Sequence, residues 1–252
     1  MNRNTLIGAI IIIVVLGGIV WYGATRPAAP AASTVATSTI PEAGPYVEHG
    51  QYFDITANYP TTTPLSAEAD QAARGQMRTW ISGEIAQFKT NGNFDNLTQN
   101  DIHMMGYDQG RKETLQIKYL IASSPRTVSY IYTEYLDTLG AHGNTFFKTF
   151  TFDTETGALL SLSDVFQGDY LATLSQLARA KLPAIIGQGY DLTFIKDGTT
   201  PDAKNFQSFF FDNTDFVVLF PPYQVAPYSS GPQTLRIPVA QLDSVLQPAY
   251  RP

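Results

Sequence analysis

Two segments carry apolar residues at the three- and four-residue spacing of an amphipathic helix. The first helix is predicted over about residues 66–90, with Ser66 as its N-cap and Asn91-Gly92 at its end. The second is predicted over residues 170–186, with Asp169 as its cap. The apolar positions are Ala69, Ala73, Met77, Trp80, Ile81, Ile85 and Phe88 in the first segment, and Leu171, Leu174, Leu177, Leu182 and Ile185 in the second.

Shorter segments alternate apolar and polar residues, as strands do when one face is buried. They span residues 51–59, 115–121, 128–132, 145–152, 206–211, 216–220 and 234–238. Strands and helices do not alternate regularly along the chain, so the order favours an α+β fold over a parallel α/β fold. We therefore expect an antiparallel sheet, or sheets, packed with the two main helices.

The N-terminal region has a different pattern, because residues 6–22 are almost all apolar and no charge lies between Arg3 and Arg26. The 22 residues of that uncharged interval reach about 33 Å as a helix, enough for a hydrocarbon core of about 30 Å. The pattern predicts a transmembrane helix over 6–24 with a cytoplasmic tail at 1–5. The alternative is a signal peptide cleaved near residues 29–31 (APA), which would release the rest as a secreted protein.

Residues 25–45 are mostly Ala, Pro, Ser and Thr, a composition typical of an extended linker that buries little. The rest, 46–252, is predicted to be one extracytoplasmic domain with an N-terminal half at 46–138 and a C-terminal half at 139–252.

Composition excludes several functions. Lys and Arg number 16 against 22 Asp and Glu, which gives a net charge of −6 and argues against nucleic acid as a partner. Cysteine is absent, so disulfides, thiolate metal sites and thiol nucleophiles are excluded. No two of His49, His103 and His142 have metal-binding helical spacing, and Asp101, His103 and Asp108 are expected in a solvated loop. Neither a metal site nor a cofactor is predicted.

Four motifs stand out in the second half of the chain. They are 140–144 (GAHGN), 149–153 (TFTFD) followed by Thr156-Gly157, 160–166 (LSLSDVF) and 220–231 (FPPYQVAPYSSG). With these motifs the sequence resembles the RsiV/PdaC-like bacterial extracytoplasmic domain of unknown function over most of residues 50 to 248. One position departs from the pattern, since Leu139 stands where the family has the first Gly of a Gly-Gly-Ala-His run.

The resemblance implies a place in the bacterial envelope, outside the cytoplasmic membrane. Domains of that family occur in a lysozyme-sensing anti-sigma factor and beside the catalytic domain of a cell-wall deacetylase. The resemblance therefore implies a binding function at the cell wall. Together with the apolar N-terminal run, it places this chain in the cytoplasmic membrane as a single-pass protein with its N-terminus inside.

The candidate ligand-binding residues are His142, Asn144, Tyr223, Gln224 and Tyr228. Gly140 and Gly143 free the backbone around His142, and the prolines of 221–231 stiffen a loop whose tyrosines can face a sugar or a partner protein. The alternative is that both segments only hold loops to the core.

No catalytic residue is predicted. A nucleophile elbow of the G-x-S-x-G type is absent. The pairs Glu134 with Asp137 and Asp153 with Glu155 are expected to be surface charges, and 153–157 (DTETG) is expected to be a turn.

The leading interpretation is a membrane-anchored binding or sensing domain that recognises peptidoglycan or a lysozyme-like protein without catalysis. One alternative is an envelope-acting hydrolase that uses an unidentified carboxylate or His142. Another is an assembly part of a larger envelope complex.

Overall fold

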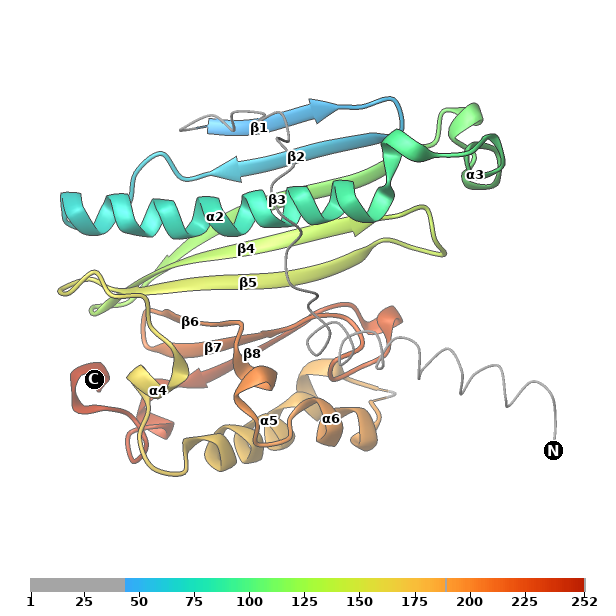
Figure 1. Cartoon of the computed structure of the whole chain (residues 1–252). Helices are drawn as coiled ribbons and strands as arrows, with labels where there is room; N and C mark the ends of the chain where they lie inside the picture. Colours follow the sequence, from blue (N-terminus) through green and yellow to red (C-terminus); the bar gives the residue numbers. More distant parts are fainter. Residues whose placement is uncertain (1–43, 189, 252) are drawn as a thin grey trace, which may run out of the picture. The chain divides into compact units, whose positions relative to one another are not determined.

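The computed structural model describes residues 44–188 and 190–251, which form an α+β fold with two sheets (Figure 1). The predicted tail at 1–5, the anchor at 6–24 and nearly all of the linker lie outside these residues. Within the described ranges, no helix is both long and apolar enough to cross a bilayer.

The strands are β1 (Gly44–His49), β2 (Phe53–Tyr59), β3 (Glu113–Ser123), β4 (Thr127–Asp137), β5 (Asn144–Asp153), β6 (Phe209–Asp212), β7 (Asp215–Phe220) and β8 (Gln233–Pro238). The α-helices are α2 (Ala67–Gly92), α3 (Gln99–Met105), α4 (Leu162–Val165), α5 (Tyr170–Ile186) and α6 (Leu192–Gly198).

Both main helices are confirmed, and their caps explain where they begin. The Ser66 side chain accepts a hydrogen bond from the Ala69 N–H at the start of α2. The Asp169 side chain does the same for the Ala172 N–H at the start of α5. Helix α2 ends at Asn93, whose φ of 47° is a left-handed conformation that asparagine tolerates.

The five-stranded sheet has the order β1-β2-β3-β4-β5 and corrects the expectation of a purely antiparallel sheet. Strands β3, β4 and β5 are antiparallel as expected, but β2 pairs with β3 in parallel, with Phe53 opposite Glu113. The reason is the connection, because α2 lies between β2 and β3 in sequence and returns the chain to the starting end. Strand β1, which the pattern did not predict, pairs with β2 and begins at Gly44.

Helix α2 packs its apolar stripe on one face of this sheet (Figure 1). The buried residues of the helix are Ala73, Met77, Ile81, Ile85 and Phe88, which recur every three or four positions. They contact side chains that alternate along β2, β3, β4 and β5, among them Ile55, Ile117, Tyr130, Tyr132, Phe150 and Phe152.

The three-stranded sheet, in the order β6-β7-β8, builds the second core against α5. Its phenylalanines Phe209 and Phe216 face Leu174 and Leu182 of that helix within one cluster. Its other face carries Phe210 and Val217, which pack with Ile131 of β4. The chain is therefore layered as helix, sheet, sheet and helix.

Strand β5 belongs in sequence to the C-terminal half expected at 139–252, but it pairs with β4 of the N-terminal half. It belongs to the five-stranded sheet, yet it also holds the other sheet, because the Thr151 hydroxyl donates to the Phe209 carbonyl at 3.1 Å. The described residues accordingly belong to one compact unit.

Candidate functional site

Two loops that are far apart in sequence meet at one end of the two sheets. One loop joins β4 to β5 and contains His142, and the other joins β7 to β8 and contains Tyr223 and Tyr228. We call these three residues the His–Tyr cluster. The sequence singled out all three side chains, and the structure brings them together.

The three rings of the cluster stack and hydrogen-bond. The His142 ring lies on the Tyr228 ring with centroids 3.6 Å apart and planes 17° apart. Its Nε2 atom is 3.1 Å from the Tyr223 hydroxyl, and the Tyr228 hydroxyl donates to the Gly143 carbonyl at 2.8 Å. His142 and Tyr223 are exposed, the latter by 48%. The cluster thus offers solvent an aromatic surface with polar edges.

The hydrogen bonds fix the tautomer of His142 in its neutral form. Its Nδ1 atom lies 3.1 Å from the Gly143 carbonyl, which can only accept, so Nδ1 carries the proton. Nε2 is then an acceptor for the Tyr223 hydroxyl. The imidazole therefore orients the phenol of Tyr223 at the surface.

Backbone strain is concentrated in these same two loops. Among the described residues, four that are not glycine have a positive φ. Two of these are asparagines, which tolerate this conformation. The other two are Leu139 at 60° and Tyr223 at 71°. The Gln224 N–H donates to the Pro221 carbonyl, so Tyr223 occupies the third position of a tight turn that favours glycine. Strain of this kind costs about 1–3 kcal/mol per residue and is common at functional sites.

The backbone at Leu139 shows what its departure from the family pattern means. A left-handed φ suits glycine, and this chain holds a leucine there, with the Leu139 N–H bonded to the Asp137 carboxylate at 2.9 Å. At Gly143 the reason for glycine is different, because a Cβ atom there would collide with the hydroxyl end of Tyr135 and force that side chain or the loop to move.

The other two candidate residues are placed differently. Asn144 begins β5 opposite Leu136 and is half-buried in the sheet ladder. The Gln224 side-chain amide donates to the carbonyls of Gly198 and Asn205, at 3.0 and 2.9 Å. Its donors therefore tie the loop to the core and do not face the surface.

A second group of polar residues, not predicted from the sequence, lines a pocket of about 210 Å³ beside α2. It contains the carboxyl groups of Glu84, Glu113 and Glu134. Burial, with the charge of Glu84 nearby, raises the pKa of Glu134 to about 7. Burial also raises the pKa of Glu84, against a hydrogen bond from Trp80. The expectation that Glu134 is a surface charge beside Asp137 was therefore wrong.

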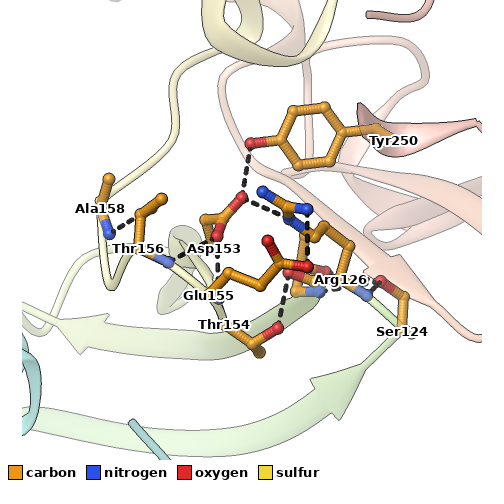
Figure 2. Close-up of polar contacts among 9 residues, drawn as sticks. Ser124, Arg126, Asp153, Thr154, Glu155, Thr156, Ala158 and Tyr250 are labelled. Carbon is orange, nitrogen blue, oxygen red and sulfur yellow. Dashed lines mark hydrogen bonds and ion pairs between the residues drawn. The ribbon is translucent and has the colours of Figure 1, made fainter. Parts of the chain in front are cut away.

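The expectation for Asp153 was wrong as well, because this carboxylate is buried with its side chain 3% exposed. It accepts hydrogen bonds from Arg126 Nε at 2.8 Å, from the Tyr250 hydroxyl at 3.0 Å and from two backbone N–H groups (Figure 2). Burial alone would raise the pKa of Asp153, but these bonds outweigh it and lower the pKa to about 2. The DTETG segment is a turn, as predicted, with Gly157 N–H bonded to the Asp153 carbonyl.

The acidic and histidine residues near position 103 lie in helix α3 and the turn after it, not in a loop. Asp101 caps α3 by accepting from Thr98, and His103 Nδ1 lies 3.0 Å from Asp108 Oδ2. Across residues 44–188 and 190–251, no three acidic or histidine side chains are placed to hold a metal ion.

The fold and the aromatic surface define a class, an α+β domain that displays stacked rings on loops at one end of two packed sheets. Residues 163–240 match the family described as "Protein of unknown function (DUF3298)". Over 208 residues the chain is 29% identical to the Peptidoglycan-N-acetylmuramic acid deacetylase PdaC of Bacillus subtilis (strain 168). That match covers 81% of this chain and 41% of PdaC, so the chain spans about two fifths of its relative. The resemblance found in the motifs is confirmed.

A solved structure supports the fold. A DUF3298 family member from Bacteroides fragilis NCTC 9343 superimposes with a TM-score of 0.55 at 16% identity, covering 81% of this chain and 91% of that one. A DUF3298 family protein from Pseudomonas aeruginosa PAO1 has a TM-score of 0.48 at 15% identity, covering 83% and 94%.

Proposed function

We propose that this chain is a membrane-anchored extracytoplasmic protein that binds cell-wall glycan on the His–Tyr cluster. The observation that carries the proposal is the convergence of three predicted residues into one exposed, stacked and strained surface. Tyr223 holds a positive φ while its side chain stays 48% exposed, so core packing does not account for that conformation.

The chemistry of the cluster suits a sugar. A pyranose ring presents C–H groups on its faces, which pack against the negative face of an aromatic ring. Hydroxyl and amide groups at its edges can bond to the Tyr223 hydroxyl and the His142 ring. Because His142 and Tyr228 already hold one another, little side-chain freedom is lost on binding.

The relative supports the same context. PdaC is named for an action on peptidoglycan, and this chain matches a stretch of it without spanning its whole length. The apolar run at residues 6–22 and the linker after it would hold the domain near the wall. No deacetylase activity is proposed for this chain.

The test is calorimetric titration of the full chain in detergent with soluble peptidoglycan fragments of N-acetylglucosamine and N-acetylmuramic acid. We expect saturable binding that Tyr223→Ala weakens at least tenfold, which is about 1.4 kcal/mol. The matched control is Tyr190→Ala, because Tyr190 is 44% exposed on the connection between α5 and α6. Absence of binding, or equal loss in both variants, would overturn the proposal.

A lysozyme serves as the second titrant. If it binds through Tyr223 and His142 while the glycan fragments do not, the partner is a wall-degrading protein and the glycan proposal fails. Tyrosine-rich surfaces also serve protein interfaces, so this outcome has its own physical basis.

A second candidate function rests on Glu134. A carboxyl group with a pKa of about 7, raised by burial and by the nearby Glu84, can act as a general acid at neutral pH, which fits the alternative of an envelope-acting hydrolase. Its pocket of about 210 Å³ is small for a glycan, so we rank it second.

The hydrolase candidate predicts that the full chain releases soluble product from purified peptidoglycan. Glu134→Gln should abolish the release, and the exposed Glu68→Gln should leave it unchanged. Product formation that survives Glu134→Gln would eliminate this residue as the acid.

A further inference from the structure

A cleft of about 380 Å³ lies far from the His–Tyr cluster. It opens between the turn from β3 to β4, the turn from β6 to β7 and the segment after β8. Its lining includes Arg126, Phe211, Asn213, Val239, Ala249 and Arg251. A volume above about 300 Å³ is in the range of small-ligand pockets.

The lining has one sign of charge. It includes two arginines, Arg126 and Arg251, and no aspartate or glutamate. Most of the other walls are apolar, with Phe211 and Val239 among them, while Asn213 and Thr214 add polar groups. Apolar walls with a few cationic and polar groups favour a ligand that is anionic at one end and apolar beside it.

Arg126 is held in place for such a ligand (Figure 2). Its Nε bonds to Asp153 at 2.8 Å and its Nη1 to Glu155 at 2.8 Å, and its guanidinium carbon lies 6.0 Å from the centre of the Tyr250 ring. Its Nη2 has no hydrogen-bond partner among the described residues. Neither carboxylate lines the cleft, so they orient the guanidinium without occupying its remaining donors.

The second arginine is fixed in a similar way. Nε and Nη2 of Arg251 donate to the Leu246 carbonyl at 3.2 and 3.1 Å. Its nearest ion-pair partner in the described chain is Asp243, at 3.7 Å. A guanidinium bonded to a neutral carbonyl keeps its charge available to an anion.

The opposing wall is also tied down. The Asn213 N–H donates to the Ser123 carbonyl at 2.9 Å, and the Val239 N–H donates to the Thr214 carbonyl at 2.8 Å. These bonds join the β6–β7 turn to the end of β3 on one side and to the residues after β8 on the other. The cleft is therefore a shaped site with preorganised walls.

We infer that this cleft binds the C-terminal carboxylate and the last small apolar residues of a short peptide. The carboxylate would contact Arg126 and Arg251, the small side chains would lie against Phe211 and Val239, and peptide amides would bond to Asn213 and Thr214. Charge complementarity selects the carboxylate, and the apolar walls select what precedes it.

The site does not depend on the proposed glycan function. Thr127 of the cleft and Asp137, which leads into the His142 loop, are the two ends of β4. Ten steps of an antiparallel strand span about 34 Å, so one site can fail while the other works.

The test uses the full chain in detergent, titrated with N-acetyl-alanyl-alanine, with its C-terminal amide and with inorganic phosphate. We expect the free acid to bind with a dissociation constant in the millimolar range or tighter, and the amide at least tenfold more weakly. Equal binding of acid and amide, or phosphate binding as tight as the peptide, would overturn the inference.

Variants test the location of binding. Arg251→Gln should weaken binding of the free acid at least fivefold. Arg236→Gln should leave this affinity unchanged, because Arg236 pairs with Asp212 and Asp215 outside the cleft. If Arg251→Gln does not fold, Ala249→Leu replaces it as the test, because the larger side chain should fill the cleft and weaken binding of the free acid. Unchanged affinity in a folded Arg251→Gln or Ala249→Leu variant contradicts the assignment.

Discussion

At the scale of single residues, several loop and turn residues have an unusual backbone conformation or an unusual environment. Leu139 and Tyr223 adopt a backbone conformation that glycine favours, and Asp153 keeps its charge while buried. Each departure needs support from elsewhere in the chain. For Asp153 the support comes from Arg126 and Tyr250, which are 27 and 97 positions away in sequence.

Leu139→Gly should stabilise the protein. Glycine adopts a φ of 60° without the steric penalty of a side chain, and this gain exceeds its greater freedom in the unfolded chain. We expect the free energy of unfolding to rise by about 1 kcal/mol and Tm by about 2–4 °C in thermal denaturation.

The control for that substitution is Leu120→Gly, because Leu120 is 74% exposed on β3 and is not among the residues with positive φ. It should lower Tm. A lower Tm for Leu139→Gly as well would show that packing of the leucine outweighs its strain.

Asp153→Asn should destabilise the protein, most clearly at neutral pH. The folded pKa of Asp153, about 2, lies below its ordinary 3.8, so its stabilising effect is complete above pH 3.8 and is lost as the pH falls through about 2. This shift corresponds to about 2 kcal/mol. Urea denaturation at pH 7 and pH 3 should show a larger loss at pH 7, and equal losses would contradict the role of the charge.

At the scale of elements, the sequence predicts the features that depend on residues close together in the chain. Helices α2 and α5 have side-chain caps and an apolar stripe, so their limits could be predicted closely. Strand β2 could also be predicted from the sequence. The alternation of its residues indicates which face is buried, but it does not indicate which strand pairs with β2. The parallel partner β3 lies beyond α2, and nothing in the alternation of Ile55 and Ala57 indicates it.

The same limit applies to the candidate site. His142, Tyr223 and Tyr228 stood out through glycine, proline and aromatic content, but their contact depends on how two loops meet. The burial of Glu134 and Asp153 could not be predicted, because an isolated carboxylate pattern looks like a surface charge. Partners distant in sequence decide its environment.

Gly143→Ala tests the loop between β4 and β5 as an element. Its Cβ would collide with the hydroxyl end of Tyr135, and we expect the loop to shift to relieve this contact, so that the stacking of His142 on Tyr228 is lost. We expect ring-proton shifts of His142 and Tyr228 to change in NMR spectra. Gly140→Ala, which has nothing within 4 Å, is the control and should leave them unchanged.

At the scale of the whole molecule, two sheets and two main helices are joined into one unit with the His–Tyr cluster at one end and a cleft at the other. The carboxyl groups beside α2 lie near the end of β4 that leads into the His142 loop, and we expect them to make stability depend on pH. The pKa of Glu134 is raised from 4.5 to about 7, so the folded state binds more protons than the unfolded state between these values.

Stability should therefore fall as the pH rises from about 5 to 8. Glu134→Gln removes the titrating group, and we expect it to raise the free energy of unfolding at pH 8 by roughly 1–3 kcal/mol while changing it little at pH 5. Denaturation curves at the two values measure the difference. A variant with the same pH dependence as the original chain would exclude Glu134 as its source, and Glu68→Gln should show that unchanged dependence.

The parallel pairing of β2 with β3 has a consequence for how the chain folds. Strands β3, β4 and β5 follow one another through short turns, so their pairing closes small loops and can form early. Phe53 meets Glu113 only after all of α2 and α3 has been placed, which closes a much longer loop. The hairpin of β1 and β2 would then be the last part of the sheet to dock.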